Sequence, residues 1–120
     1  AFRTPSLRNV EFTGPWGHAG AYSDLSKFVT AHADPRTALY NFERSGVVLP
    51  QFDTLDWRIM DEPTEVAAIA DAVSVRAIPL TSKEVWEIVA FLGSLTDTTA
   101  LAGRLGIPNS VPSGLVVPNP

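Results

Sequence analysis

The side chains best suited to chemistry in this sequence are two histidines, and His32 has the more informative surroundings. It follows Leu25, Phe28 and Val29 by seven, four and three residues, so all four share one face of a predicted helix. An imidazole on an apolar helix face is a candidate metal ligand. The alternative is an ordinary histidine near a helix end, where the helix dipole favours a protonated ring.

The absence of cysteine narrows the chemistry that this chain can perform. None of the 120 residues is a cysteine, which excludes a disulfide framework, a thiolate metal site, a cysteine nucleophile and covalent attachment of haem c by this chain. The acidic residues Asp53, Asp56 and Asp61 do not follow the spacing of an EF-hand loop, so we expect them to be solvated. The three tryptophans are expected to be packing residues.

Composition predicts a folded chain and gives no indication of a highly charged partner such as nucleic acid. Hydrophobic residues make up 45% of the sequence and charged residues 18%, which is typical of a packed body. The formal net charge of −4 gives no reason to expect binding to nucleic acid or to an anionic membrane. No apolar stretch is long enough to span a bilayer. The length fits one small domain or part of a larger one.

Helices are the predicted elements. Ser23 is a predicted N-cap with Asp24 in the first turn, and the helix that carries His32 should end at Asp34 because Pro35 follows. A capping box over 81–84 and an apolar stripe predict a second helix from about Ser82 to Leu95. A third, shorter helix is expected over 65–73.

The rest of the chain is expected to be irregular. Residues 1–22 are rich in proline and glycine; a short helix over 37–42 and loops around the acidic residues are expected in the middle. The last fourteen residues contain four prolines and are predicted to form an extended tail that wraps a surface. The predicted fold class is therefore all-α, with long irregular connections, an extended C-terminal tail and a thin core.

Two blocks of the sequence resemble a known family. The first comprises FRTPSLRNV (residues 2–10), TGPWGHAG (13–20) and the helix that starts at Leu25. It resembles the pattern F-[KR]-[TV]-P-[ST]-L-R-N-[VI], T-[AG]-P-[YW]-x-H-[DA]-G and L-x-x-V-V of bacterial di-haem cytochrome c peroxidases and MauG-like enzymes. The second block, LTSKEVWEIVAFL (80–92), is similar to the C-terminal cytochrome c helix of that family, and both blocks occur in the family's order.

The resemblance implies a two-domain protein with two haems, each held by a Cys-x-x-Cys-His motif. This sequence has neither motif, so both would lie upstream of it. Residues 1–120 would then form the C-terminal segment of a cytochrome c-like haem domain, either as a proteolytic piece or as a separate subunit. Alone, the chain should have no peroxidase activity.

The resemblance also implies a role for His32. The eighth position of the family's helix, counted from the leucine that corresponds to Leu25, holds the distal axial ligand of the C-terminal haem; it is methionine in the peroxidases and tyrosine in MauG. Histidine there would give a six-coordinate bis-histidine haem, unsuited to binding peroxide and of lower reduction potential than a methionine–histidine pair. Two rivals remain: Met60, which lies outside the matching helix and whose usual role is core filling, and Tyr40, which matches no family position.

Four further residues match positions with implied roles. Arg8 would pair with a haem propionate, since a guanidinium binds carboxylates through two parallel hydrogen bonds; the alternative is a simple salt bridge. His18 lies in the family's haem-proximal turn, with a structural role expected and Ala19 in place of the family's aspartate. Thr13 and Pro15 match positions whose backbone carbonyls contribute to a calcium site between domains.

The expected function follows from these matches. The chain would be a haem-pocket segment or subunit of a periplasmic di-haem peroxidase-like or MauG-like oxidoreductase, with hydrogen peroxide or a protein residue as substrate. Its partners would be the upstream haem-bearing polypeptide and an electron-donor or substrate protein. Two alternatives stay open: a cytochrome subunit that only transfers electrons, and a structural or interaction domain without haem.

Overall fold

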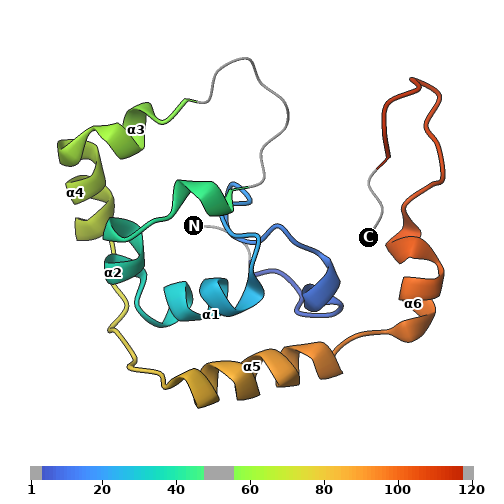
Figure 1. The fold of residues 1–120 in the computed structure, drawn as a ribbon, viewed down its shortest axis with the longest axis horizontal. Coiled ribbons are helices and arrows are strands. Elements are labelled where there is room, and N and C mark those ends of the chain that lie inside the picture. Colours follow the sequence, from blue (N-terminus) through green and yellow to red (C-terminus); the bar gives the residue numbers. More distant parts are fainter. Residues whose placement is uncertain (1–3, 48–55, 118–120) are drawn as a thin grey trace.

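The computed structural model describes residues 4–47 and 56–117, and within these ranges the regular structure is helical (Figure 1). The only β pairing there is a single antiparallel bridge between Trp16 and Tyr22. The α-helices are α1 (Leu25–Ala33), α2 (Pro35–Tyr40), α3 (Arg58–Asp61), α4 (Pro63–Asp71), α5 (Ser82–Ser94) and α6 (Thr98–Ala102). Short 3-10 helices, η1 to η3, occupy Val10–Phe12, Arg44–Gly46 and Arg104–Gly106. The all-α prediction is thus confirmed for the described residues.

Helix α1 begins one residue later than the predicted cap implied. Asp24, not Ser23, is the N-cap: its backbone is extended (φ −122°, ψ 121°) and its carboxylate accepts a hydrogen bond of 2.9 Å from the Lys27 N–H. A carboxylate is as good a cap as a hydroxyl and also interacts favourably with the helix dipole. The predicted end at Asp34 is confirmed, and Asp34 in turn caps α2, which has Pro35 at its start.

Helix α5 matches its prediction most closely. The Thr81 hydroxyl accepts a hydrogen bond from the Glu84 N–H (3.2 Å), and the Glu84 carboxylate accepts one from the Thr81 N–H (2.7 Å). The backbone N–H and the hydroxyl of Thr81 lower the pKa of Glu84, because both stabilise its charged form. The capping box predicted from the sequence is therefore present with both of its hydrogen bonds.

The middle of the chain is more helical than predicted. Helix α2 confirms the expected short helix, and α4 starts at Pro63, two residues before the predicted start. The loop expected around Asp61 is wrong, because Asp61 is the last residue of α3. The side chain of Asp56 accepts a hydrogen bond of 2.9 Å from the Arg58 N–H at the start of that helix. The sequence analysis did not predict this local contact. Asp53 lies outside the described residues.

The C-terminal region contains an unpredicted helix and a tail that does not wrap the body. Asp97 caps α6 by accepting hydrogen bonds from the N–H groups of Thr99 (2.9 Å) and Ala100 (3.2 Å). The residues from 107 to 117 have no regular structure. Leu115 and Val116 are 73% and 96% exposed, so the expectation that the tail covers an apolar surface is wrong for these residues.

The helices meet in a small apolar core. Helix α1 packs against α5 and α2, and α2 packs against α4. Figure 1 shows α5 running below α1, with α2 to α4 at one end of this pair and α6 at the other. The buried apolar side chains of the described residues are few and small: Leu25, Ala31, Val66, Ala70 and Leu92.

The chain exposes far more surface than a compact domain of its mass. Its accessible surface is 9277 Å². A folded monomer of 12.9 kDa should expose about 6,300 Å². The radius of gyration is 16.6 Å, whereas a compact domain of this length has about 14 Å. The chain forms its helices but buries less apolar surface between them than a compact domain of this size does.

Candidate functional site

His32 lies on the last full turn of α1 with its ring exposed. The edge of its imidazole meets the ring of Phe28, with the ring centroids 4.4 Å apart and the planes at 74°. Leu25, on the same face, is buried, and Phe28 and Val29 are half-buried. The helix and its apolar face are as predicted, and His32 is the exposed member of that face.

The end of α1 is tied to the segment that leads into α5. The Ile78 N–H donates a hydrogen bond of 2.8 Å to the carbonyl of Ala33, the residue after His32. Val75 and Ile78 in this segment are 60% and 61% exposed. An axial haem ligand needs an imidazole that can reach iron, and the exposed position of His32 meets that requirement.

A series of aromatic contacts holds α1 on the side of Phe28. The ring of Tyr22 lies 5.5 Å from that of Phe28 and 6.0 Å from that of Phe42, whose ring is 6.3 Å from Trp57. Burial raises the pKa of Tyr22. The guanidinium of Arg44 lies 5.0 Å above the Trp57 ring and pairs with an acidic side chain of α3. The aromatic side chains before α1 and after α2 thus form a second small packing cluster beside the helix.

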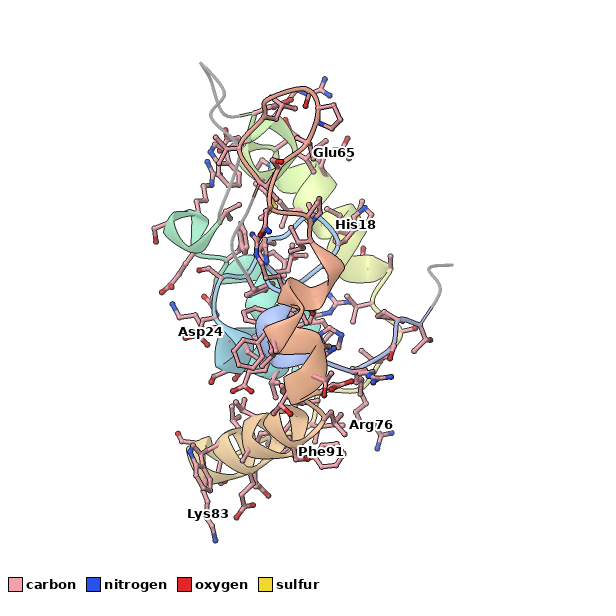
Figure 2. The ribbon with its side chains drawn as sticks, turned by 90° about the vertical axis from the view of Figure 1, so that its right-hand side faces the viewer. His18, Asp24, Glu65, Arg76, Lys83 and Phe91 are labelled. Carbon is pink, nitrogen blue, oxygen red and sulfur yellow. The ribbon has the colours of Figure 1, made fainter. Side chains whose placement is uncertain are left out.

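The turn that contains His18 is built by two glycines. Gly17 and Gly20 have φ angles of 91° and 64°, which only glycine adopts without strain. They close the turn between Trp16 and Tyr22, whose backbones exchange hydrogen bonds of 2.8 and 3.0 Å. His18 lies exposed within this turn, and Figure 2 shows it well separated from Lys83 and Phe91 on α5. The turn around His18 is therefore structured as its glycines predict.

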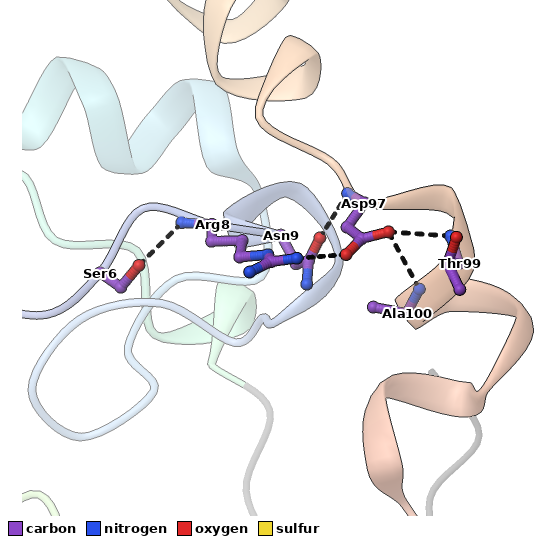
Figure 3. Close-up of polar contacts among 6 residues, drawn as sticks. All are labelled: Ser6, Arg8, Asn9, Asp97, Thr99 and Ala100. Atoms are coloured by element: carbon purple, nitrogen blue, oxygen red, sulfur yellow. Dashed lines mark hydrogen bonds and ion pairs between the residues drawn. The ribbon is translucent and has the colours of Figure 1, made fainter.

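Arg8 belongs to a group of polar contacts between the N-terminal segment and the start of α6, which we call the clasp (residues 8–9 with 95–97; Figure 3). The guanidinium of Arg8 pairs with the Asp97 carboxylate. The side-chain oxygen of Asn9 accepts a hydrogen bond of 2.6 Å from the Asp97 N–H, and the Asn9 N–H donates one of 3.2 Å to the Leu95 carbonyl. Asn9 adopts a left-handed conformation (φ 60°), which asparagine tolerates better than most residues.

The clasp lowers the pKa of Asp97. The largest cause is the hydrogen bond from Arg8, followed by that from the Ala100 N–H. Two roles were considered for Arg8, a contact with a haem propionate and a simple salt bridge, and the salt bridge is present. A guanidinium carries five N–H donors, so pairing with Asp97 is compatible with contact to a second carboxylate. The propionate contact stays a prediction.

The residues expected near calcium lie in an exposed loop. Thr13 follows η1, and both its N–H (3.3 Å) and its hydroxyl (3.4 Å) donate to the Val10 carbonyl. Pro15 is likewise exposed. Over 4–47 and 56–117, no three histidine, aspartate or glutamate side chains gather into a metal site.

The rival ligands lie in a different part of the fold from His32. Half-buried Met60 and exposed Tyr40 both line a cavity of about 310 Å³ between α2, α3 and α4. A larger cavity of about 540 Å³ lies along α1 and α2, beside the ion pair of Lys27 and Glu43. His32 lines neither of them. The structure therefore does not bring the candidate ligands together, and His32 stands apart on its own face.

The tryptophans differ in a way that the sequence did not predict. Trp16 is half-buried and its indole N–H donates to the Val10 carbonyl (2.8 Å), and Trp57 is half-buried in the aromatic cluster. Trp86 on α5 is 69% exposed. Packing was the expected role of all three, and within this chain it is wrong for Trp86.

Comparison with protein families, with characterised proteins and with solved structures finds no match to this chain. The family relationship therefore rests on the quoted motifs and is carried forward as a proposal. Within the described ranges, no helix has the length and apolar character needed to cross a bilayer.

Proposed function

We propose that this chain is the C-terminal haem-pocket segment of a di-haem cytochrome c peroxidase-like or MauG-like oxidoreductase, in which His32 is the distal axial ligand of an electron-transfer haem. The haem would be attached to polypeptide that lies outside this chain, because no cysteine is present here. The resemblance places such a protein in the periplasm.

The observation that carries the proposal is the setting of the His32 imidazole. The ring is exposed, although it lies on the apolar face of α1 and against the Phe28 ring at 4.4 Å. Leu25, Phe28 and Val29 are covered within the chain, so the exposed imidazole at the end of their face is available to a partner that carries a metal. The excess accessible surface of the chain supports the same view.

The proposed role of His32 is to fill one axial position of the iron and to set its potential. When bound, the haem supplies one-electron redox chemistry. His32 would hold the iron through its neutral imidazole. A haem held in this way would serve electron storage or relay, and the peroxide-reactive haem would be the other one. Phe28 fixes the ring orientation through its edge contact.

The remaining matched residues have supporting roles in this proposal. Arg8 would contact a propionate while it stays paired with Asp97, and His18 would support the turn that faces the haem. Calcium would bind between domains, with Thr13 and Pro15 contributing carbonyls. Each of these roles depends on the upstream polypeptide.

The test is a ligand replacement in the assembled, haem-loaded protein. His32→Ala should convert one low-spin ferric haem to high-spin, as read by the Soret and charge-transfer bands and by electron paramagnetic resonance. His32→Met should restore a low-spin centre with a higher reduction potential. Lys83→Ala is the control, since Lys83 is 82% exposed on α5 and has no role in the proposed haem pocket, and it should leave the spin state unchanged.

Three outcomes decide between the proposal and its alternatives. An unchanged spectrum in His32→Ala would remove His32 from the iron. An assembly with only low-spin haem and no response to peroxide would identify a cytochrome that only transfers electrons. An assembly without a Soret band would identify a structural or interaction domain without haem.

A further inference from the structure

A continuous series of aromatic rings begins at His32. The centroid of its imidazole lies 4.4 Å from that of the Phe28 ring. The Phe28 ring lies 5.5 Å from the Tyr22 ring, which lies 6.0 Å from the Phe42 ring. Phe42 in turn lies 6.3 Å from Trp57. Rings in contact have their centroids roughly 4.5–7 Å apart, so each step of this series is a direct contact between neighbouring rings.

The ring series joins four separate segments of the chain. Phe28 and His32 lie one turn apart on α1, a spacing at which side chains of a helix meet. Tyr22 precedes α1, Phe42 follows α2, and Trp57 is the residue at which α3 begins. Figure 1 shows α2 between α1 and α3, so the series passes from one part of this group of helices to another.

The turn before α1 holds the middle of the series in place. The backbone of Tyr22 exchanges hydrogen bonds of 2.8 and 3.0 Å with that of Trp16. The backbone of Gly17, in the same turn, lies directly over the next contact of the series. A Cβ atom at Gly17 would touch both the Tyr22 ring (3.4 Å) and the Phe28 ring (3.5 Å). The position of the two rings is therefore fixed by the turn as well as by α1.

The series runs beside the buried core and ends at the surface. The buried apolar residues of the described ranges are all aliphatic, whereas the rings of the series are half-buried, except for the exposed His32. At the other end, Trp57 follows the exposed Asp56, and the guanidinium of Arg44 lies 5.0 Å from the centroid of its ring. Electron tunnelling falls off less steeply through packed atoms than across open space. A series of touching rings from a metal ligand to the surface is therefore suited to carry electrons.

We propose that the ring series from Trp57 through Phe42, Tyr22 and Phe28 to His32 is an electron-transfer route between the surface and the iron that His32 would hold. A reduced one-electron carrier at the Trp57 end would lose one electron, and ferric iron at the other end would gain it. No bond forms or breaks, and the Tyr22 phenol keeps its proton. The inference rests on the proposed function for the iron and goes beyond it in naming the path.

The absence of cysteine from this chain allows an electron to be injected at a chosen position. In the assembled, haem-loaded protein, a photoactive ruthenium complex is attached to Asp56→Cys, next to Trp57, or to Lys83→Cys on α5. Reduction of the low-spin haem after a flash is then followed by its absorbance. Lys83 is the matched control because its side chain is 82% exposed and lies outside the ring series.

Tyr22 allows the route to be broken or kept at one position. Tyr22→Leu removes the ring and leaves a gap, so it should slow reduction from position 56 by about tenfold or more. Reduction from position 83 should keep its rate, which also shows that the variant is folded. Tyr22→Phe removes only the hydroxyl and should keep the rate from both positions. Phe42→Leu breaks a second link and should act as Tyr22→Leu does.

The outcomes separate this inference from the proposed function, which the spin state of His32→Ala decides. Unchanged reduction from position 56 in Tyr22→Leu and Phe42→Leu, or equal slowing from both positions, overturns the route even where His32 proves to be the ligand. A rate that depends on the rings, in a protein whose spin state does not respond to His32→Ala, supports the route and rejects His32 as the ligand. An assembly without haem overturns both.

Discussion

Two regions of this molecule differ in how many of their groups have a partner within the chain. One is the polar clasp between residues 8–9 and 95–97, and the other comprises the apolar surfaces of α1 and α5. In the clasp the backbone of Asn9 and the carboxylate of Asp97 have partners within the chain, and α6 is capped by the same aspartate. Among the described side chains, no buried polar atom lacks a hydrogen-bond partner. By contrast, Trp86, Phe91 and Ile78 expose most of their apolar side chains.

The difference lies in how many partners each kind of group needs. A polar group needs only one or two hydrogen bonds, whether in a local cap or in the clasp, whose residues lie 88 and 89 positions apart in the sequence. Burial of apolar surface needs facing elements, and a chain that lacks some of these elements leaves the surface open. Over residues 4–47 and 56–117, the buried polar side-chain atoms have partners, whereas large apolar side chains such as Trp86 and Phe91 stay exposed.

The largest expected effect concerns the isolated chain. Because only five of the described residues are buried and apolar, it should unfold without a sharp transition, and its urea m-value should fall below the roughly 1 kcal/mol/M that is the low end for small proteins. Far-UV circular dichroism against temperature and urea measures both. A steep two-state transition with an ordinary m-value would mean that the core is already complete.

A smaller effect is expected from the one contact that is well packed. In the assembled protein, Leu92→Ala should reduce the free energy of unfolding by about 2–5 kcal/mol, because it leaves a cavity between α5 and α1. Leu115→Ala is the matched control: the same substitution at a side chain that is 73% exposed should change stability by less than about 0.5 kcal/mol. Equal effects at both positions would contradict the burial difference.

The clasp predicts a pH dependence of known sign. The pKa of Asp97 lies below its ordinary value in the folded chain, chiefly because of Arg8, so the stabilisation is present above the ordinary aspartate pKa and is lost as pH falls through the folded value. Carboxyl-carbon NMR titration of Asp97 should give a midpoint below that of an exposed aspartate. In Arg8→Ala the midpoint should rise; an unchanged midpoint would mean that the ion pair does not form in solution.

The smallest effect is expected at the polar part of α5. Lys83 and Glu87 are 82% and 51% exposed and lie one helical turn apart, so Lys83→Ala should change stability by no more than about 0.5 kcal/mol. The difference should vanish in high salt, where exposed charges are screened. A loss above about 1 kcal/mol in thermal melts would show that this part of α5 is covered by a partner.

The sequence predicted the helices of this fold better than it predicted what packs against each helix. The capping box of α5 and the stop of α1 before Pro35 were found because their signals are local. Helix α6 was missed, although Asp97 is its cap, because five helical residues leave too short a pattern. The exposure of His32 and Trp86 could not be foreseen, since periodicity tells which residues share a face but not whether anything covers it.

For the candidate site, too, the sequence predicted the local features and missed the long-range contacts. His32 lies on the predicted helix with the predicted neighbours, and its separation from Met60 agrees with their places in the sequence. The pairing of Arg8 with Asp97 joins residues 89 positions apart, and no spacing rule reaches that far. The haem itself stays a proposal, since this chain has no cysteine that could attach it.

The hydrogen bond from the Ile78 N–H to the Ala33 carbonyl has a consequence for how this chain can vary. It brings the point where the backbone leaves α1 to within 2.8 Å of the point where it returns toward α5. The stretch between them is thus a loop whose two ends meet, and the entropic cost of closing such a loop grows only slowly with its length. A change of length in that stretch that leaves α2, α4 and their contacts intact should therefore let both anchored helices keep their positions.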